Sequence, residues 1–222
     1  MIAYSEQQIR EGLTITLRSI CSQNNGSEVA LRILMECGDR REERRLVLTV
    51  EQYLEQKPVK GILSEEAYEA LEAAAELCRA IRAGENLLAY GGNTVQMLTQ
   101  KLMRRGFSRE NAIQASEYLR NKGVIDEQRD LEREFEKCLN KLWGAKRIHA
   151  QMWTKGFGVD AMAALPGLLE EIDFVPRCAA LIRKHYGEVP TDADEQRRMI
   201  AWLSRYGYSL QEIRASMRTI QS

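Results

Sequence analysis

The chain has 222 residues, with 32 Lys or Arg, 32 Asp or Glu and two His, so its formal net charge is zero. Its hydrophobic share of 44% and charged share of 29% are ordinary for a globular protein, with enough chain for one large domain or several small modules. The balanced total does not indicate nucleic-acid binding, and no stretch has the roughly 18 apolar residues that cross a membrane.

The cysteines indicate a reducing environment. Five cysteines, an odd number, lie far apart without a C-x-x-C pair, and several occupy apolar positions of helical patterns. We therefore expect buried reduced thiols. The N-terminus lacks the basic-then-apolar pattern of a secretory signal. Together these features predict a soluble cytoplasmic protein with no membrane association.

The first 60 residues predict a small antiparallel β meander. Apolar and polar residues alternate with the period of two that a half-buried strand requires. Asn24-Asn25-Gly26 favours a hairpin turn because Asn and Gly accept positive φ, and Gly38-Asp39 favours another. We expect strands over residues 13–19, 29–35 and 45–49, and a short helix over residues 50–56. The charged run 40–45 is expected to form a solvated turn rather than a binding site.

From Ser64 onward the apolar period becomes helical. Several expected helices begin at a residue that can cap them: Ser64, Asn93 or Thr94, Ser108, Asp126 and Ser209. The last unit is expected to begin near Asp173. Ser209-Leu-Gln-Glu212 matches a capping box. Gly84 is expected to stop or interrupt the first long helix. Pro166 is expected to break a helix that starts near Gly158.

One pattern recurs three times: a helical stretch, a basic residue, then glycine and an aromatic residue. The glycines are Gly106, Gly156 and Gly207, almost evenly spaced at 50 and 51 residues. Self-similarity at this period is typical of helical repeats. Apolar residues eight and four positions before each glycine share a helix face, and the glycine ends the helix in the left-handed conformation. These apolar pairs are Leu98 and Leu102, Ile148 and Met152, and Met199 and Leu203.

The fold class predicted from these elements is mainly α: a tandem array of three three-helix repeats with a small antiparallel β meander at the N-terminus. We expect an N-terminal β-rich extension over residues 1–60. The three repeats are expected over residues 61–123, 124–172 and 173–222.

No enzyme site can be located in the sequence. The two histidines, His149 and His185, have no cysteine or carboxylate at the spacing of zinc ligands. There is no phosphate-binding G-x-x-x-x-G-K-[ST] loop, dinucleotide fingerprint or G-x-S-x-G nucleophile elbow. We expect neither catalytic residues nor a metal or other cofactor.

Basic residues are the more informative set. Residues 1–93 carry 11 Lys or Arg against 15 Asp or Glu, whereas residues 94–222 carry 21 against 17. In each expected repeat the positive charge gathers on the second helix or next to it, and at a fixed interval it would form a stripe along a polyanionic or acidic partner. Ordinary solubilising charge explains the pattern equally well. The candidate partner-binding residues are Lys101, Arg104, Arg105, Arg129, Lys141, Lys146, Arg147, Lys155, Arg183, Lys184, Arg197, Arg198 and Arg205.

Several segments, in order, resemble the RecX family of bacterial recombination regulators. The resemblance covers roughly residues 63–217. Its first segment is Gly123-Val-Ile-Asp-Glu-Gln-Arg129, and the second is Gly144-Ala-Lys-Arg-Ile148 followed by Lys155-Gly-Phe157. The third is Arg183-Lys-His-Tyr-Gly-Glu188 followed by Trp202-Leu-Ser-Arg-Tyr-Gly-Tyr208. Each segment is weak alone, and the ordered set is specific.

This resemblance implies a non-enzymatic protein, an array of three-helix repeats that binds the RecA filament on single-stranded DNA and restrains its activity in recombination and the SOS response. The motif positions most able to reach a partner are Arg129 and Arg147, and we expect a monomer. Tyr90-Gly-Gly-Asn-Thr94 departs from the family pattern because it lacks the usual arginines. The rival hypothesis is a direct DNA-binding helical module, whose affinity would fall steeply with salt; the near-neutral charge indicates that such binding is weak.

Overall fold

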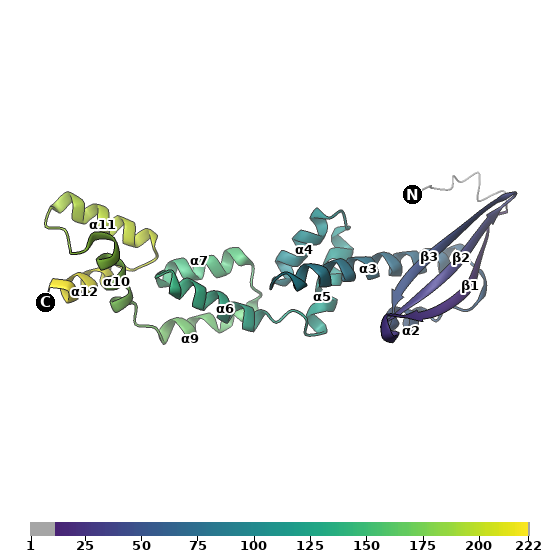
Figure 1. Cartoon of the computed structure of the whole chain (residues 1–222), viewed down its shortest axis with the longest axis horizontal. Helices are drawn as coiled ribbons and strands as arrows, with labels where there is room; N and C mark the ends of the chain where they lie inside the picture. Colours follow the sequence, from purple (N-terminus) through teal and green to yellow (C-terminus); the bar gives the residue numbers. More distant parts are fainter. Residues whose placement is uncertain (1–11, 222) are drawn as a thin grey trace. The chain divides into compact units, whose positions relative to one another are not determined.

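The structure is a computed structural model that describes residues 12–221 (Figure 1). Residues 1–11 of the predicted N-terminal extension, and Ser222, lie outside the described residues. The chain is mainly helical with a small antiparallel sheet near its N-terminus, which confirms the predicted fold class at this level. It divides into two compact units, residues 12–87 with 102–119 and residues 88–101 with 120–221. The arrangement in three repeats stays a prediction.

The sheet of the first unit has four antiparallel strands in the order β3-β2-β1-β4. Their bounds are β1 Thr14–Gln23, β2 Glu28–Cys37, β3 Arg40–Thr49 and β4 Gly61–Leu63. Asn24, Asn25 and Gly26 all have positive φ in the 3-10 turn η1 (Asn24–Gly26) between β1 and β2. The predicted hairpin and its turn residues are therefore confirmed.

One expectation for this region is wrong, and one strand was not expected. The charged run 40–45 is the first half of strand β3 rather than a turn. Its charges face partners on neighbouring elements: Arg41 lies 2.8 Å from the Glu36 carboxylate, and Arg44 lies 3.1 Å from that of Glu72. Because charged residues on both faces form these pairs, this half of the strand lacks the alternation of apolar and polar residues by which a strand is recognised in a sequence. Strand β4 was missed because three residues are too few to show a period.

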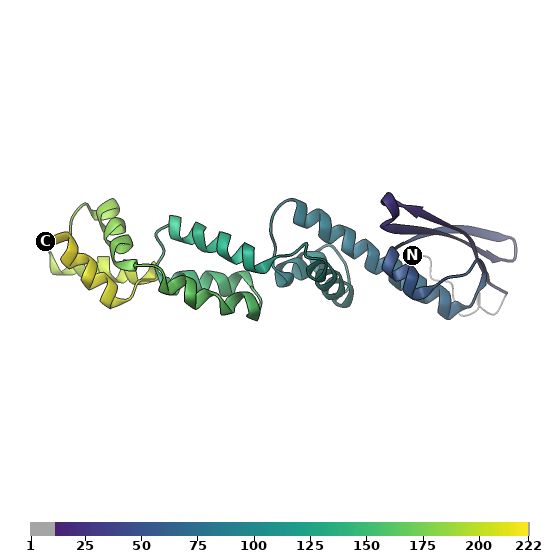
Figure 2. The ribbon, with the colours of Figure 1, turned by 90° about the horizontal axis from the view of Figure 1, so that it is seen from below.

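One face of the sheet forms the core of the first unit. Leu17, Leu31, Ile33 and Leu48 are at most 1% exposed and pack with residues of helix α3 (Glu65–Ala89). Figure 2 shows α3 running along this sheet. The short helix α2 spans Val50–Gln56, as predicted, and begins with a capping box between Thr49 and Gln52.

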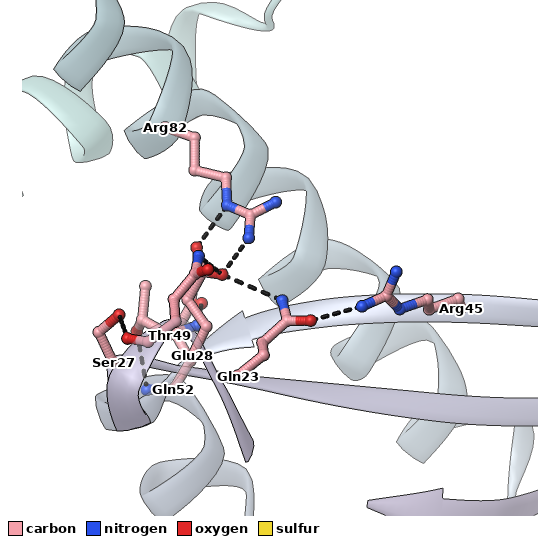
Figure 3. Close-up of polar contacts among 8 residues, drawn as sticks. Gln23, Ser27, Glu28, Arg45, Thr49, Gln52 and Arg82 are labelled. Carbon is pink, nitrogen blue, oxygen red and sulfur yellow. Dashed lines mark hydrogen bonds and ion pairs between the residues drawn. The ribbon is translucent and has the colours of Figure 1, made fainter. Parts of the chain in front are cut away.

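A buried carboxylate joins the hairpin end of the sheet to α3. Glu28 is 7% exposed, and its two oxygens accept hydrogen bonds from the Arg82 guanidinium (Figure 3). Gln23 donates to the same carboxylate at 3.0 Å, and Arg45 in turn donates to the Gln23 amide oxygen. The bond from Arg82 is the largest cause that holds the pKa of Glu28 below its usual value.

The remaining helices begin where the sequence predicts. The side chains of Ser64, Thr94, Ser108, Asp126 and Ser209 each accept a hydrogen bond from the backbone amide three residues on, which confirms them as N-caps. The helices are α4 Val95–Arg104, α5 Arg109–Asn121, α6 Glu127–Asn140, α7 Ala145–Lys155, α8 Val159–Ala163, α9 Leu165–Glu170, α10 Phe174–Tyr186, α11 Ala193–Arg205 and α12 Leu210–Gln221.

One expected helix break does not occur, and another lies two residues before the expected position. Gly84 neither stops nor interrupts α3, which continues to Ala89 with Gly84 buried inside it. Pro166 does not end a helix but stands in the first turn of α9, where its missing amide costs nothing; the break falls at Ala164.

The repeated glycine corners have the predicted geometry. Gly106, Gly156 and Gly207 have φ of +92°, +67° and +97°, and each follows the end of a helix. All six apolar residues expected on the buried face, from Leu98 to Leu203, are 0% exposed. Each corner therefore ends its helix and turns the chain while the preceding two turns stay in the core.

Within the second unit, the start of α4 contacts the end of α7; we call this contact the α4–α7 interlock. The Thr94 hydroxyl donates to the Lys155 carbonyl oxygen at 2.9 Å. The Glu127 carboxylate accepts from the backbone amides of Val95 at 2.8 Å and Gly158 at 2.7 Å. One carboxylate thus satisfies free amides at the N-termini of both α4 and α8.

The start of α7 contacts the end of α11 in the same way; we call this the α7–α11 interlock. The backbone amides of Gly144 and Lys146 donate to the carbonyl oxygens of Tyr206 at 2.8 Å and Gly207 at 3.1 Å. The Tyr208 hydroxyl donates to the Leu142 carbonyl at 2.8 Å. A Cβ added at Gly144 would lie 2.4 Å from the Gly207 backbone, so this approach requires glycine.

Candidate partner-binding surface

The predicted basic residues of α4 lie near its C-terminal end. Arg104 and Arg105 are exposed and form no ion pair within the described part of the chain, whereas the Lys101 ammonium donates to the Asn93 side-chain oxygen. Only the two arginines are therefore free to meet a partner.

The second group surrounds α7. Lys146 on α7 and Arg129 on α6 are exposed and unpaired, while Lys155 is half-buried and lies 3.6 Å from the Glu134 carboxylate. Lys141 follows the end of α6 and lies over the Trp143 ring at 4.9 Å. The structure therefore gives Lys155 an internal partner and leaves Lys146 and Arg129 available.

The third group lies on α10 and α11, and all its members are exposed. Arg197 pairs with Asp194 at 3.2 Å, and the other four have no ion pair with any residue from 12 to 221: Arg183, Lys184, Arg198 and Arg205. Of the thirteen predicted residues, contacts bring together only Lys141 and Arg147, which share the Trp143 ring.

Arg147 lies between two aromatic rings. Its guanidinium carbon is 4.2 Å from the centre of the Trp143 ring and 4.9 Å from that of Tyr206. No carboxylate of the described residues lies within ion-pair distance of it. Two cation–π contacts hold the planar fork in one orientation, and its N–H donors remain unpaired with any acid.

The rings continue beyond Tyr206. Trp202 lies 4.6 Å from Tyr206, and His185 stacks parallel on Trp202 at 4.5 Å with 9° between the planes. Tyr186 packs T-shaped against both His185 and Trp202. We call this set, from Lys141 through Trp143, Arg147, Tyr206 and Trp202 to His185 with Tyr186, the aromatic–cation row. It lies wholly in the second unit.

Sequence reasoning named the aromatic residues near the basic ones but did not connect them. One signal was available: residues 137–159, 174–187 and 196–211 hold five, three and three Lys or Arg, and no Asp or Glu. These three segments supply every member of the row. The absence of acidic residues from these segments indicates a positively charged surface there, which the zero net charge of the whole chain does not show.

The motif residues have mostly structural positions. Asp126 caps α6, and Ile148 is fully buried. Gly123 has φ of +71° and ends α5, whereas Gly144 and Gly156 lie where a Cβ would meet another segment closely. The positive charges of these motif segments lie on Arg129, Lys146, Arg147 and Lys155.

The three buried thiols are not activated. Burial is the largest cause that raises the pKa of Cys78 to about 11, and it raises the pKa of Cys138 and Cys178 as well. These three are buried free thiols as predicted, but Cys21 on strand β1 is exposed and Cys37 half-buried. Between residues 12 and 221, no three His, Cys, Asp or Glu side chains are grouped so as to hold a metal ion, and no helix is both long and apolar enough to cross a membrane.

Comparison with known proteins identifies the family. A regulatory protein RecX of Halorhodospira halophila is 30% identical over 133 residues, which are 59% of this chain and 81% of the relative. The chain belongs to the RecX family. The regulatory protein RecX of Stenotrophomonas maltophilia is also 30% identical, over 122 residues that cover 54% of this chain and 74% of the relative. No family model matches the chain.

Solved RecX structures share the fold. A crystal structure of a regulatory protein RecX matches 92% of this chain and 99% of its own, with a TM-score of 0.68 and 16% identity. RecX from Lactobacillus salivarius matches 67% of this chain and 98% of its own, with a TM-score of 0.57 and 18% identity. The first match leaves out only 8% of this chain, so it extends into the sheet, which lay outside the sequence resemblance.

Proposed function

We propose that this protein regulates the RecA recombinase: it binds the RecA filament on single-stranded DNA and inhibits or modulates its ATPase, recombination and SOS-response activity. It does so as a cytoplasmic monomer, without catalysis and without a cofactor. Membership of the RecX family, whose curated relatives are named regulatory proteins, carries this proposal.

The proposed body is an array of three three-helix repeats over residues 61–123, 124–172 and 173–222, preceded by the β-rich extension. The two interlocks support it, because each joins the start of one repeat's second helix to the glycine corner that ends the next repeat's second helix. A repeated contact of this kind sets a regular pitch, as binding along a helical filament requires.

The proposed contact surface consists of the exposed basic residues, with α7 at its centre. Helix α7 has no acidic residue and exposes Lys146, His149 and Trp153, the last at 74%. An exposed tryptophan beside unpaired cations is the composition of an interface anchor, and it fits an acidic partner surface that offers an apolar pocket.

The test measures ATP hydrolysis and strand exchange by the cognate RecA on single-stranded DNA with the protein added in stoichiometric amounts. The wild-type chain is expected to lower both activities. No change in either would overturn the proposal.

Variants locate the surface. Charge reversal at Lys146 and Arg147 is expected to weaken inhibition. Because Arg147 also packs on two rings, a Lys146→Glu/Trp153→Ala variant separates loss of contact from loss of packing. The matched control, Arg18→Glu/Arg40→Glu, reverses two exposed charges on β1 and β3. Equal inhibition by all variants, with unchanged thermal melts, would show that α7 does not face the partner.

A further inference from the structure

The first unit has a groove that the proposed contact with RecA does not use. The groove has a volume of about 480 Å³ and is lined by residues of α2, α3 and α5, all of which belong to this unit. On α3 its lining is mostly apolar and small: Ala70, Ala73, Ala74 and Leu77. Because alanine side chains are short, they leave space between the three helices. We call this space the alanine groove.

Hydrogen bonds between the helices fix the spacing of the groove walls. The Gln52 side chain of α2 donates to the Ala74 carbonyl oxygen of α3 at 2.9 Å. The Tyr118 hydroxyl of α5 donates to the Glu51 carboxylate of α2 at 3.1 Å. A partner therefore meets a surface that is already formed, and little conformational entropy is lost in ordering it.

The charged residues of the groove are all acidic. Its lining includes Glu55, Glu76 and Glu110, but no Lys, Arg or His. Glu55 and Glu110 are exposed and form no ion pair with any residue between 12 and 221. Glu76 lies 3.7 Å from the Arg79 guanidinium, and a pair this exposed contributes little. Two of the three carboxylates are therefore available to a cation from outside.

The sequence around the groove has the same bias. Residues 50–56 and 64–78 hold seven Glu and no Lys or Arg. This part of the first unit therefore repels nucleic acid and other polyanions. Its charge is opposite to that of the basic residues on and around α7, so the groove is separate from the surface of the proposed function. The electrostatic complement of the groove is a cation.

The apolar lining indicates which kind of cation fits. A Lys or Arg side chain has an aliphatic stem that packs on alanine and a charged head that reaches a carboxylate. Large apolar side chains are also exposed beside two of the carboxylates: Leu54 precedes Glu55 on α2, and Ile113 lies one turn after Glu110 on α5. A protein segment with its own apolar side chains covers such surface, whereas a free polyamine does not.

We propose that the alanine groove binds a basic amphipathic segment of a partner protein. The stems of its Lys or Arg side chains lie over the alanines, and their charged heads lie at Glu55 and Glu110. This interaction goes beyond the proposed regulation of RecA and requires neither the recombinase nor DNA. Since the carboxylates are exposed, its affinity falls as the salt concentration rises.

The test uses the full chain and a fluorescein-labelled amphipathic peptide of about 14 residues, built from Lys, Leu and Ala at helical spacing, followed by fluorescence anisotropy. The competitors are the unlabelled peptide, the same peptide with Glu in place of Lys, and spermine. Only the unlabelled Lys peptide is expected to displace the probe efficiently. Absence of saturable binding would overturn the proposal. Displacement by spermine at the same concentration of positive charge would also overturn it and assign the groove to polyamines.

A double variant tests the charge of the groove. Glu55→Gln/Glu110→Gln keeps the size of both side chains and is expected to weaken peptide binding roughly tenfold. The matched control, Glu43→Gln/Glu85→Gln, removes the same charge from two exposed positions of the first unit that do not line the groove. The control is expected to bind like the wild type. Equal weakening by both variants would show attraction to net charge alone and overturn the proposal.

A second variant tests the space over the alanines. Ala73→Leu fills part of the groove and is expected to abolish most of the peptide binding. Ala67→Leu makes the same change at another exposed position of α3 and should not affect it. Both should keep the wild-type urea midpoint, because leucine is a strong helix former. Equal binding by both would show that the peptide lies elsewhere.

The two proposals can fail separately. The Lys146→Glu/Trp153→Ala variant, which tests the surface for RecA, is expected to bind the peptide like the wild type. The Glu55→Gln/Glu110→Gln variant is expected to inhibit RecA like the wild type. Loss of peptide binding in the Lys146→Glu/Trp153→Ala variant would place the peptide at α7 and overturn the assignment to the groove.

Discussion

The two compact units are held together by different means. The first unit buries one face of a sheet against α3 and adds an ion pair at the hairpin end, in which the buried Glu28 carboxylate meets the half-exposed Arg82 guanidinium. The second has no strand among its described residues; its helices pack around an apolar core that runs from Leu131 to Ile213, and they also meet at interlocks made of backbone amides, carbonyls and close glycine contacts. Removing the charge of Glu28 should therefore destabilise the first unit, whereas adding one methyl group at an interlock glycine should destabilise the second.

The stability of each unit can be measured separately, because each unit has its own spectroscopic or exchange probe. All three tryptophans, Trp143, Trp153 and Trp202, belong to the second unit, so tryptophan fluorescence reports on that unit alone. All the strands lie in the first unit, so hydrogen exchange of strand amides reports on the other.

The largest effect is expected for Gly144→Ala. Its new Cβ would lie 2.4 Å from the Gly207 backbone, which cannot move aside as a flexible side chain can. We expect a loss of about 3 kcal/mol or more in the free energy of unfolding, seen by tryptophan fluorescence in urea. Gly167→Ala is the control, since that site lies in a helix with open space around it and should tolerate or favour alanine. Equal stability of the two variants would contradict the glycine interlock.

A smaller loss is expected for Glu127→Ala, which breaks the α4–α7 interlock. It removes an acceptor shared by two backbone amides, and we expect about 2–3 kcal/mol. Glu136→Ala, at an exposed site on the same helix, should change stability little. Hydrogen exchange should locate the loss at the amides of Val95 and Gly158; protection retained there would argue against this role.

The first unit should respond to pH. The pKa of Glu28 is lower in the folded state than in the unfolded state, so its stabilising effect is complete above the unfolded value. It is lost as the pH falls through the folded value. Strand amides should therefore lose exchange protection on acidification, by roughly 1–2 kcal/mol for this group. In Glu28→Gln that part of the dependence should vanish, and an unchanged profile would assign the acid sensitivity to other carboxylates.

The smallest effect is expected for Tyr208→Phe, which keeps the ring and removes the hydroxyl. The Leu142 carbonyl then loses its donor, and we expect about 1 kcal/mol. The pKa of Tyr208 is raised, chiefly by burial, so the hydroxyl remains a donor at neutral pH. A urea midpoint equal to that of the wild type would show that solvent replaces this bond.

Local signals predicted the helices well because their causes are local. Ser108 and Asp126 cap through amides three residues away, and each corner glycine acts on its own helix end. The interlocks were not predictable in the same way, since Thr94 bonds to Lys155 and Gly144 to Tyr206, about sixty residues along the chain.

The candidate site was likewise predictable only in its local features. The sequence pattern indicated thirteen basic residues, but it did not show that Lys155 pairs with Glu134 or that Arg147 lies between two rings. Those facts depend on which helix faces meet. The composition of individual segments would have located the aromatic–cation row better than the net charge of the chain does, because the segments that form the row contain no acidic residue.

The corner glycines differ in what surrounds them. Gly106 has positive φ but open space around it, so a side chain there would meet backbone strain alone. At Gly207 a Cβ would also lie 2.4 Å from the Arg147 backbone nitrogen, and at Gly156 it would meet the Gln96 side chain. One residue type thus serves two requirements, a left-handed helix end at every corner and a close approach of a second segment at Gly156 and Gly207.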